Sequence, residues 1–359
     1  MIRAAIVGAT GIVGQQFIVA LCKHPWIKVT ALAASERSAG KAYKESITDP
    51  KTGAFRWYCS EPCDPEVLDL PVQNAQDLDT SNVDLIFSAI ESDQALILEP
   101  KFAATKPVIS TASAFRYEND VPILVPGINN AQITLLHQQQ KTRGWKGFIT
   151  PNPNCTTTGM AITLKPILDY FGIKMVVMTS LQAVSGAGRS PGVIALDITD
   201  NVIPYISGEE EKVQRETQKI LGSVSDGAIK AANFPVSCTC TRVNVLEGHT
   251  EAVFVSTEKP CQPEEVSQVM MNFNPFKTLQ LPSAPKRMIV VSSDPFRPQP
   301  RLDRNTEDGM TTTVGRIRKD VALENGIKYV LVSHNTKMGA AKGATLTAEL
   351  LILEGYIKG

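Results

Sequence analysis

The chain has 359 residues with 36 basic and 36 acidic side chains, so its formal net charge is zero. A hydrophobic fraction of 43% and a charged fraction of 20% are typical of a globular protein with a large core, and the length predicts about two domains. The neutral charge, without any basic block, argues against nucleic acid or an anionic membrane as a partner.

Cysteine usage and the N-terminal sequence predict a reduced, cytoplasmic protein. Seven cysteines are too few for a disulfide scaffold at this length, and an odd number leaves at least one unpaired. Cys59 and Cys63 have no second Cys/His pair at zinc spacing, so we expect no metal site. The chain runs directly into a strand over residues 2–7 without a signal-peptide pattern, and no apolar stretch is long enough to span a membrane.

Strands and helices alternate in the first part of the chain. Apolar strands are predicted over residues 3–7, 29–33, 83–89 and 107–110, with a helix over residues 14–23. Near-continuous apolar strands separated by helices predict a parallel sheet covered on both faces. We therefore expect an α/β protein whose residues 1–154 form a Rossmann-like nucleotide-binding domain.

The strand pattern changes after Cys155. Residues 176–184, 236–245, 250–258 and 328–333 alternate more strongly, which predicts an antiparallel or mixed sheet with one covered face in a second, α+β domain over residues 155–334. Glu247-Gly248 resembles a hairpin turn between two of these strands. An Ala/Leu-rich helix over residues 339–357 has no domain of its own, and residues 282–303 predict an ordered surface loop.

A glycine-rich turn follows the first strand. Residues 8–14 (GATGIVG) open the first helix, as in dinucleotide-binding folds, although the glycine spacing differs from GxGxxG. Gly8 permits the tight turn, Gly11 lets a pyrophosphate approach the backbone, and Gly14 lets the helix sit close to the sheet. The alternative is a glycine-rich loop without a ligand.

The end of the second strand bears on which nicotinamide cofactor would bind. An NAD enzyme places a carboxylate there for the ribose 2′-hydroxyl. Arg37, flanked by Ser35 and Ser38, suits a 2′-phosphate and favours NADP, whereas Glu36 is the competing NAD interpretation.

Residues 151–159 (PNPNCTTTG) place Cys155 behind a Pro/Asn elbow, after a short strand and ahead of an apolar-periodic helix over residues 160–171. Asn154 or Cys155 would be the N-cap. The positive end of the helix dipole favours thiolate over thiol, and thiolate is the nucleophilic form. The Asn154 amide and the Cys155 N–H could form an oxyanion hole. The alternative is a buried structural cysteine.

A thiolate that forms acyl intermediates needs an acid/base group, and histidine is the usual choice. Of four histidines, His249 begins a strand after the expected hairpin, which would bring it close to Arg242. Arginine can hold a substrate carboxylate with two parallel hydrogen bonds. The alternatives are a solvated strand arginine and a turn histidine.

These motifs together resemble the aspartate-semialdehyde dehydrogenase family, and the Asn-Cys-Thr-Thr-Thr-Gly form resembles its archaeal and fungal branch. The resemblance covers the full length in the same order: residues 8–14, 35–38, 154–159, 182–188, 209–212, 242–249 and 335–343.

The resemblance implies a role for each of four catalytic residues. Cys155 would be the nucleophile and His249 the acid/base, with Asn154 holding the oxyanion and Gln182 orienting the reacting group.

It also implies the substrate-binding set. Arg242 would bind the substrate α-carboxylate, Glu209 its amino group, and Lys212 together with Arg116 the phosphate. The Glu/Lys spacing equally fits a surface ion pair, and Glu118 beside Arg116 would weaken a phosphate site.

The expected cofactor is NADP(H), and the C-terminal helix over residues 335–359 would complete its domain. The residues expected to contact it come from the glycine turn, the strand ends and two later segments: Gly8, Thr10, Gly11, Ile12, Val13, Gly14, Ser35, Arg37, Ser38, Ser88, Ala89, Ser185, Gly186, Gly188 and Asn335.

The implied activity is the NADPH-dependent reductive dephosphorylation of L-aspartyl 4-phosphate to L-aspartate 4-semialdehyde through a Cys155 thioester. This reaction belongs to the biosynthesis of threonine, methionine and lysine. The resemblance also implies a homodimer or homotetramer assembled through the second domain, with the small-molecule substrate and phosphate as the other partners.

Three alternatives remain. An acyl-CoA reductase of the malonyl-CoA type would keep Cys155 and His249 without needing Glu209. An N-acetyl-glutamyl phosphate reductase would keep the phosphate chemistry. A catalytically silent Rossmann module has no reason to hold Cys155, His249, Arg242 and Glu209 together.

Overall fold

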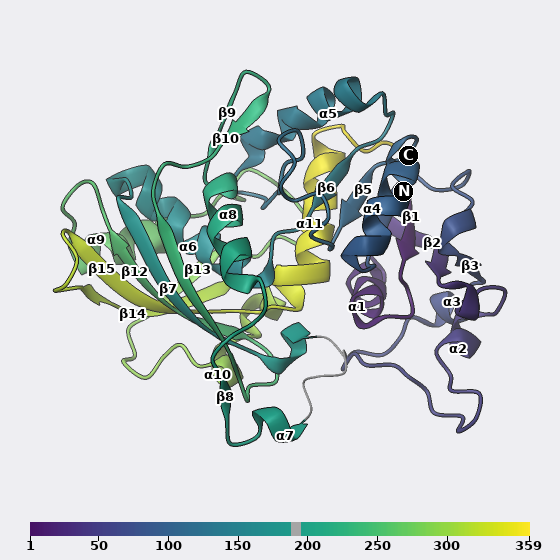
Figure 1. The fold of residues 1–359 in the computed structure, drawn as a ribbon, viewed down its shortest axis with the longest axis horizontal. Helices are drawn as coiled ribbons and strands as arrows, with labels where there is room; N and C mark the ends of the chain where they lie inside the picture. The colour runs from purple at the N-terminus through teal and green to yellow at the C-terminus, as the bar shows by residue number, and fades with distance from the viewer. Residues whose placement is uncertain (188–194) are drawn as a thin grey trace.

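The computed structural model describes residues 1–187 and 195–359, which form two lobes, each built on one β-sheet (Figure 1). Gly188, expected to contact the cofactor, lies outside the described residues. No helix among the described residues is both long and apolar enough to cross a membrane.

The N-terminal lobe contains a six-stranded parallel sheet in the order β3-β2-β1-β4-β5-β6. Alternate residues of β1 enter two separate apolar clusters: Ala4 and Ile6 face one, Ala5 and Val7 the other. The sheet is therefore covered on both faces, as the apolar strands predict. Its strands are β1 (Ile2–Val7), β2 (Ile27–Ala34), β3 (Val72–Asn74), β4 (Leu85–Ser88), β5 (Val108–Ser110) and β6 (Ile149–Pro151).

Helices on this lobe include one from the far end of the chain. The helices are α1 (Ile12–Leu21), α2 (Tyr43–Ser46), α3 (Pro65–Leu68), α4 (Ser92–Ala103), α5 (Leu135–Arg143) and α11 (Lys342–Leu353). α11 follows a π-helical turn over Lys337–Ala341 and packs against α1 and β5 (Figure 1). Buried His24 donates from Nε2 to Glu349 of α11 at 2.8 Å, which fastens the C-terminal helix to the end of α1.

The second lobe contains a seven-stranded mixed sheet in the order β13-β14-β15-β12-β7-β11-β8. In β7 buried residues alternate with more exposed ones, because helices cover one face of this sheet. The strands are β7 (Met175–Gln182), β8 (Val202–Ile203), β11 (Val236–Val243), β12 (His249–Ser256), β13 (Ile289–Ser292), β14 (Thr312–Lys319) and β15 (Gly326–Ser333). Around this sheet lie α6 (Cys155–Phe171), α7 (Ala195–Ile198), α8 (Glu209–Ile220), α9 (Pro263–Asn272), α10 (Pro300–Asp303) and a small hairpin of β9 (Ser223–Ser225) and β10 (Ala228–Lys230).

Two expectations for this lobe are wrong. Glu247-Gly248 does not close a hairpin, because β11 and β12 flank β7 on opposite sides: β11 pairs with β7 in parallel and β12 pairs with it antiparallel. Residues 282–303 are not only a surface loop, because they contain β13, which pairs with β14 at the sheet edge, and α10.

Candidate active site

Cys155 is the first residue of α6, and the N-cap is Asn154. The Asn154 side-chain oxygen accepts from the backbone N–H groups of Thr156 at 2.9 Å and Thr157 at 3.2 Å, so it satisfies two donors that a helix start otherwise leaves open. The sulfur of Cys155 lies 3.1 Å from Nε2 of His249. The structure thus brings together the two residues expected to form the nucleophile and its proton partner.

The pKa of Cys155 differs from what its position at a helix start predicts. Burial, followed by the charge of Glu209, raises the pKa of the thiol to about 12, although Arg242, Arg116 and the N–H of Thr156 act in the opposite direction. Desolvation disfavours the charged form of any acid. Burial therefore acts against the effect of the helix start, which alone favours the thiolate.

His249 is fully buried at the start of β12. Its Nδ1 accepts a hydrogen bond of 3.0 Å from the backbone N–H of Ala183, immediately after β7. Burial, with smaller effects of Arg242 and His334, lowers the pKa of the imidazole to about 3. The ring is therefore neutral at physiological pH.

Arg242 and Gln182 are register partners on the parallel strands β11 and β7, where both strands end. Arg242 donates from Nη1 to the Ala183 carbonyl at 2.8 Å. A Cβ on Gly186 would lie 2.9 Å from Arg242 Nη1 and 3.1 Å from His249 Cε1, so the loop after β7 passes directly over both side chains. The mixed sheet, and not a hairpin, brings Arg242 and His249 together.

Glu209 begins α8 and is buried against residues 151–155, the elbow that carries Cys155 and that we call the nucleophile elbow. Its Oε1 accepts from the side-chain amide of Asn154 at 2.8 Å and from that of Gln182 at 3.1 Å. Lys212, one turn further along α8, forms no ion pair within the described part of the chain and lines the same cleft as Glu209. The alternative of a Glu209–Lys212 surface ion pair is therefore wrong.

Arg116 is buried and paired with a carboxylate that the sequence did not single out. Its Nη1 donates to Oε1 of Glu216 at 2.9 Å, and the other oxygen of Glu216 accepts from the backbone N–H of Asn154 at 2.6 Å. Glu118, expected to compete for Arg116, instead faces Arg143 at 3.5 Å. Glu216 lies two helical turns after Glu209, and this i, i+7 spacing on one helix face is the signal that could have identified it.

The cleft that joins these residues has a volume of about 1280 Å³ and extends from the glycine turn to the second lobe. We call it the main cleft. Its lining includes eleven of the expected site residues: Gly11, Ile12, Val13, Ala89, Arg116, Asn154, Cys155, Gly186, Glu209, Lys212 and Arg242.

The glycine turn has the geometry that a pyrophosphate requires. Gly8 has a φ of +85°, and a Cβ there would lie 2.3 Å from the Ala89 carbonyl oxygen. A Cβ on Gly14 would lie 2.3 Å from the Gly8 carbonyl oxygen, whereas one on Gly11 would meet only that oxygen, at 3.4 Å. The side of Gly11 that faces the main cleft is therefore open, next to the first N–H groups of α1.

The other expected cofactor residues differ in exposure. Ser35 and Arg37 are exposed at the end of β2, whereas Ser38 and Ser88 are buried and Thr10 is partly buried; these five do not line the main cleft. Asn335 is already bonded at both ends of its amide: it accepts from the N–H of Gly248 at 2.9 Å and donates to the Ser185 hydroxyl at 2.8 Å.

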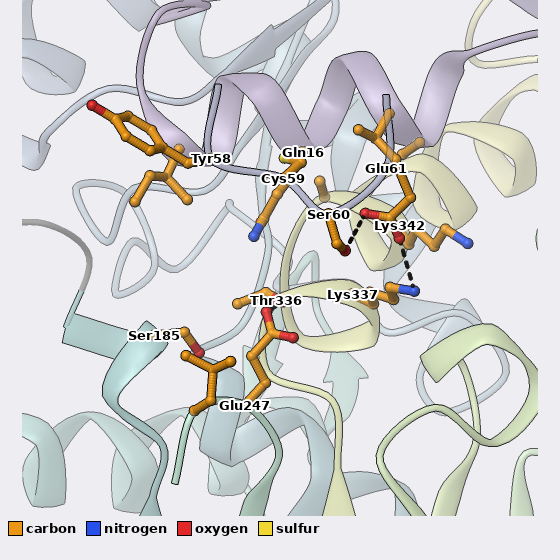
Figure 2. Close-up of a pocket in the computed structure, with 15 residues that line it drawn as sticks. Gln16, Tyr58, Cys59, Ser60, Glu61, Ser185, Glu247, Thr336, Lys337 and Lys342 are labelled. Carbon is orange, nitrogen blue, oxygen red and sulfur yellow. Dashed lines mark hydrogen bonds and ion pairs between the residues drawn. The ribbon is translucent and has the colours of Figure 1, made fainter. Parts of the chain in front are cut away.

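A second cavity of about 250 Å³ lies on the other side of Ile12, between α1, residues 58–61 and the start of α11 (Figure 2). Lys337 spans this region and pairs with Glu61 at 3.2 Å. Ile12 and Tyr58 line both cavities, and Ser185 lines this one. The second cavity therefore adjoins the main cleft.

The glycine turn on a 3-2-1-4-5-6 parallel sheet, with a Cys–His pair at the junction with a mixed sheet, defines a nucleotide-dependent oxidoreductase. The sequence matches two family models: the NAD binding domain of semialdehyde dehydrogenases over residues 3–136 and their dimerisation domain over residues 164–338.

Known relatives can be aligned with this chain over almost its whole length. The aspartate-semialdehyde dehydrogenase of Methanothermobacter thermautotrophicus is 45% identical, with 98% of this chain and 99% of the relative covered. The enzyme of the same name from Candida albicans is 41% identical, with 99% of each chain covered. The chain belongs to the aspartate-semialdehyde dehydrogenase family, as its motifs predict.

Solved structures of aspartate-semialdehyde dehydrogenases superpose on this chain over almost its whole length. The C. albicans aspartate-semialdehyde dehydrogenase, solved with NADP, superposes with a TM-score of 0.89 at 38% identity and covers 99% of this chain and 100% of its own. Aspartate-semialdehyde dehydrogenase II of Vibrio cholerae, solved in complex with ASA, has a TM-score of 0.78 at 29% identity, with 99% of each chain covered.

Proposed function

We propose that the protein catalyses the NADPH-dependent reductive dephosphorylation of L-aspartyl 4-phosphate to L-aspartate 4-semialdehyde through a thioester on Cys155. The observation that carries this proposal is the 3.1 Å contact between Cys155 and His249 in a cleft that also contains the glycine turn. A thiol at this point can reach both an acyl group and a nicotinamide bound across the same cleft.

The cofactor fits the residues around the glycine turn. Gly11 leaves room for the pyrophosphate, the start of α1 offers N–H groups to it, and exposed Arg37 with Ser35 suits the 2′-phosphate of NADP(H). When bound, NADPH supplies a hydride to the thioester carbon. Gly186 and Ser185 would border its nicotinamide half, with Asn335 holding Ser185 in place.

The substrate would lie between α8, the end of β11 and Arg116. Arg242 would bind its α-carboxylate and Glu209 its amino group, while Lys212 and Arg116 would bind its phosphate. Glu209 has fixed orientation because Asn154 and Gln182 both donate to it. In this arrangement Gln182 and Asn154 hold Glu209 against the cleft, in addition to the roles that the family resemblance implies for them.

The test is the reverse reaction: reduction of NADP⁺ by L-aspartate 4-semialdehyde, followed at the nicotinamide absorbance, with and without phosphate and with NAD⁺ and CoA in parallel. We expect activity that requires phosphate and prefers NADP⁺. Activity with CoA alone would assign the protein to the acyl-CoA reductases. No activity from a folded protein that still binds NADPH would contradict the assigned substrate.

A further inference from the structure

Glu99 is a fully buried carboxyl beneath the main cleft, and none of the proposed binding or catalytic roles involves it. It lies on α4, and its Oε1 accepts from the Ser110 hydroxyl at 2.5 Å. Ser110 ends β5 and is the register partner of Ser88, which ends β4. Glu99 therefore lies under two neighbouring strands at the edge of the sheet where the main cleft begins.

The two strand ends at Glu99 continue into the main cleft. Residues 89–92 follow β4 and residues 111–113 follow β5, and both segments line the cleft. The Ser110 hydroxyl, besides donating to Glu99, accepts from the Ala112 N–H at 3.0 Å. The segment after β4 also touches the glycine turn. The hydrogen bonds of Glu99 are thus connected to the floor on which a cofactor would lie.

Ser88 completes the polar surroundings of the carboxyl. Its hydroxyl and Oε2 of Glu99 are both buried, and within the described part of the chain neither has a hydrogen-bond partner. Ser88 nevertheless lies close enough to lower the pKa of Glu99. Buried polar atoms need partners, and these two oxygens can bond to each other once a proton lies between them. The uncharged acid supplies that proton from Oε2, while Oε1 continues to accept from Ser110.

The surroundings of Glu99 favour this uncharged acid. α4 packs against β4, β5 and β6, whose residues carry no charged side chain. Asp93 and Lys101 of α4 itself are exposed. Arg116, in the segment after β5, pairs instead with Glu216. Burial raises the pKa of Glu99 to about 7 against the opposite effect of the two serines, so the acid and its anion are both populated near neutral pH.

We propose that Glu99 is a positioning residue for NADP(H): as an uncharged acid it joins the ends of β4 and β5 under the cofactor, and loss of its proton weakens cofactor binding. The inference rests on the cofactor placement of the proposed function and not on its substrate. NADPH carries several negative charges, so a carboxylate beneath the cleft floor repels it. By linkage, NADPH binding draws a proton from water onto Glu99.

The test is the NADPH affinity of the full chain as a function of pH, measured by fluorescence titration. Glu99→Gln keeps a donor for Ser88 and an acceptor for Ser110 but cannot ionise. The cofactor and the other groups of the cleft titrate in both proteins, so the ratio of the parent Kd to the variant Kd isolates Glu99. We expect this ratio to rise about fivefold or more between about pH 6 and pH 8.5. A constant ratio would overturn the proposal.

Two further variants separate positioning from charge. Glu99→Leu removes both the charge and the hydrogen bonds, so it should bind NADPH about threefold or more weakly than Glu99→Gln over the whole pH range. Equal affinity of these two variants would show that the carboxyl does not position the strand ends. Asp93→Asn, at an exposed position of the same helix, should keep the pH profile of the parent protein.

Difference infrared spectroscopy between the parent protein and Glu99→Gln follows the proton itself. We expect the C=O band of a protonated carboxyl at the acidic end of the range, its loss at the alkaline end, and its increase near neutral pH when NADPH is added. Absence of this band at the acidic end would overturn the proposal. None of these measurements needs turnover, so an absence of phosphate-dependent activity would count against the proposed function alone.

Discussion

Cys155 differs from the other six cysteines in what surrounds its sulfur: His249 at hydrogen-bond distance and, in the same cleft, Arg242. In Cys155→Ser we expect turnover to disappear, because a serine hydroxyl is a far weaker nucleophile than a thiol in this site. NADPH affinity should stay nearly unchanged, because the glycine turn is untouched. Cys63→Ser, outside the main cleft, is the matched control for the assay and the NADPH fluorescence titration. Substantial turnover by the Cys155 variant would contradict its assignment.

Glu216 links the expected phosphate ligand to the nucleophile elbow, because one of its oxygens binds Arg116 and the other the N–H of Asn154. In Glu216→Gln the buried guanidinium loses its counter-charge. We expect the free energy of unfolding to fall by about 3 kcal/mol and KM for the phosphorylated substrate to rise. Chemical denaturation and steady-state kinetics measure the two effects.

Glu211→Gln changes an exposed residue in the first turn of the same helix and should alter neither quantity. Equal stability of the two variants would show that the Glu216–Arg116 pair does not stabilise the elbow.

At the residue scale, sequence alone predicts site residues only where their chemistry is distinctive. Cys155 and the glycine turn follow from local motifs, and Arg242 and His249 belong to one short segment. The sequence did not predict the contacts of Glu216 and of the Ala183 N–H, because each contact joins residues far apart in the chain, 62 and 66 positions respectively. The sequence predicts a thiolate from the helix N-terminus, which is a local feature, and it could not include the burial that raises the pKa of Cys155, which is a property of the folded site.

The first helix and its glycine turn act as one element. In Gly14→Ala the new Cβ would lie 2.3 Å from the Gly8 carbonyl oxygen, so α1 must move away from the turn. We expect both the melting temperature and NADPH affinity to fall. In Gly11→Ala the Cβ has room, so stability should hold while NADPH affinity falls by about tenfold or more, because the methyl group occupies the path of the pyrophosphate.

Thermal unfolding and NADPH titration of both glycine variants test this contrast. Unchanged NADPH affinity in Gly11→Ala would place the pyrophosphate elsewhere.

At the element scale, the parallel sheet was predictable and the pairing of the mixed sheet was not. Apolar runs buried on both faces identify β1, β4 and β5 without knowledge of their neighbours. The segment between β11 and β12 is short enough for a hairpin, yet β7, more than fifty residues earlier in the chain, separates the two strands. β13 was not predicted from the sequence, because it is a four-residue edge strand within a Pro-rich segment.

At the scale of the whole molecule, the mixed sheet has one face that residues 1–187 and 195–359 leave partly exposed. Met175, Val177 and Leu181 of the interior strand β7 point to that face and are each 38–39% exposed. The match of residues 164–338 to a dimerisation domain agrees with an interface there. We propose that this face joins two copies of the chain, in a homodimer or as part of a homotetramer.

Val177→Lys should break this assembly, because a charge would be buried in the centre of an apolar interface. Size-exclusion chromatography with light scattering should show a shift towards the monomer. Val321→Lys, at a position that is 96% exposed between β14 and β15, should keep the parent mass. An unchanged mass in Val177→Lys would exclude this face as the interface.

The central claim, a thioester on Cys155, can be tested by a single-turnover experiment without phosphate. L-aspartate 4-semialdehyde and NADP⁺ are mixed with the protein, the NADPH formed in the first burst is counted, and the acid-quenched protein is mapped by peptide mass spectrometry. A thioester on Cys155 predicts about one NADPH per functional site and an aspartyl adduct on the peptide that contains Cys155. NADPH formation without an adduct on that peptide, or with an adduct on another cysteine, would contradict it.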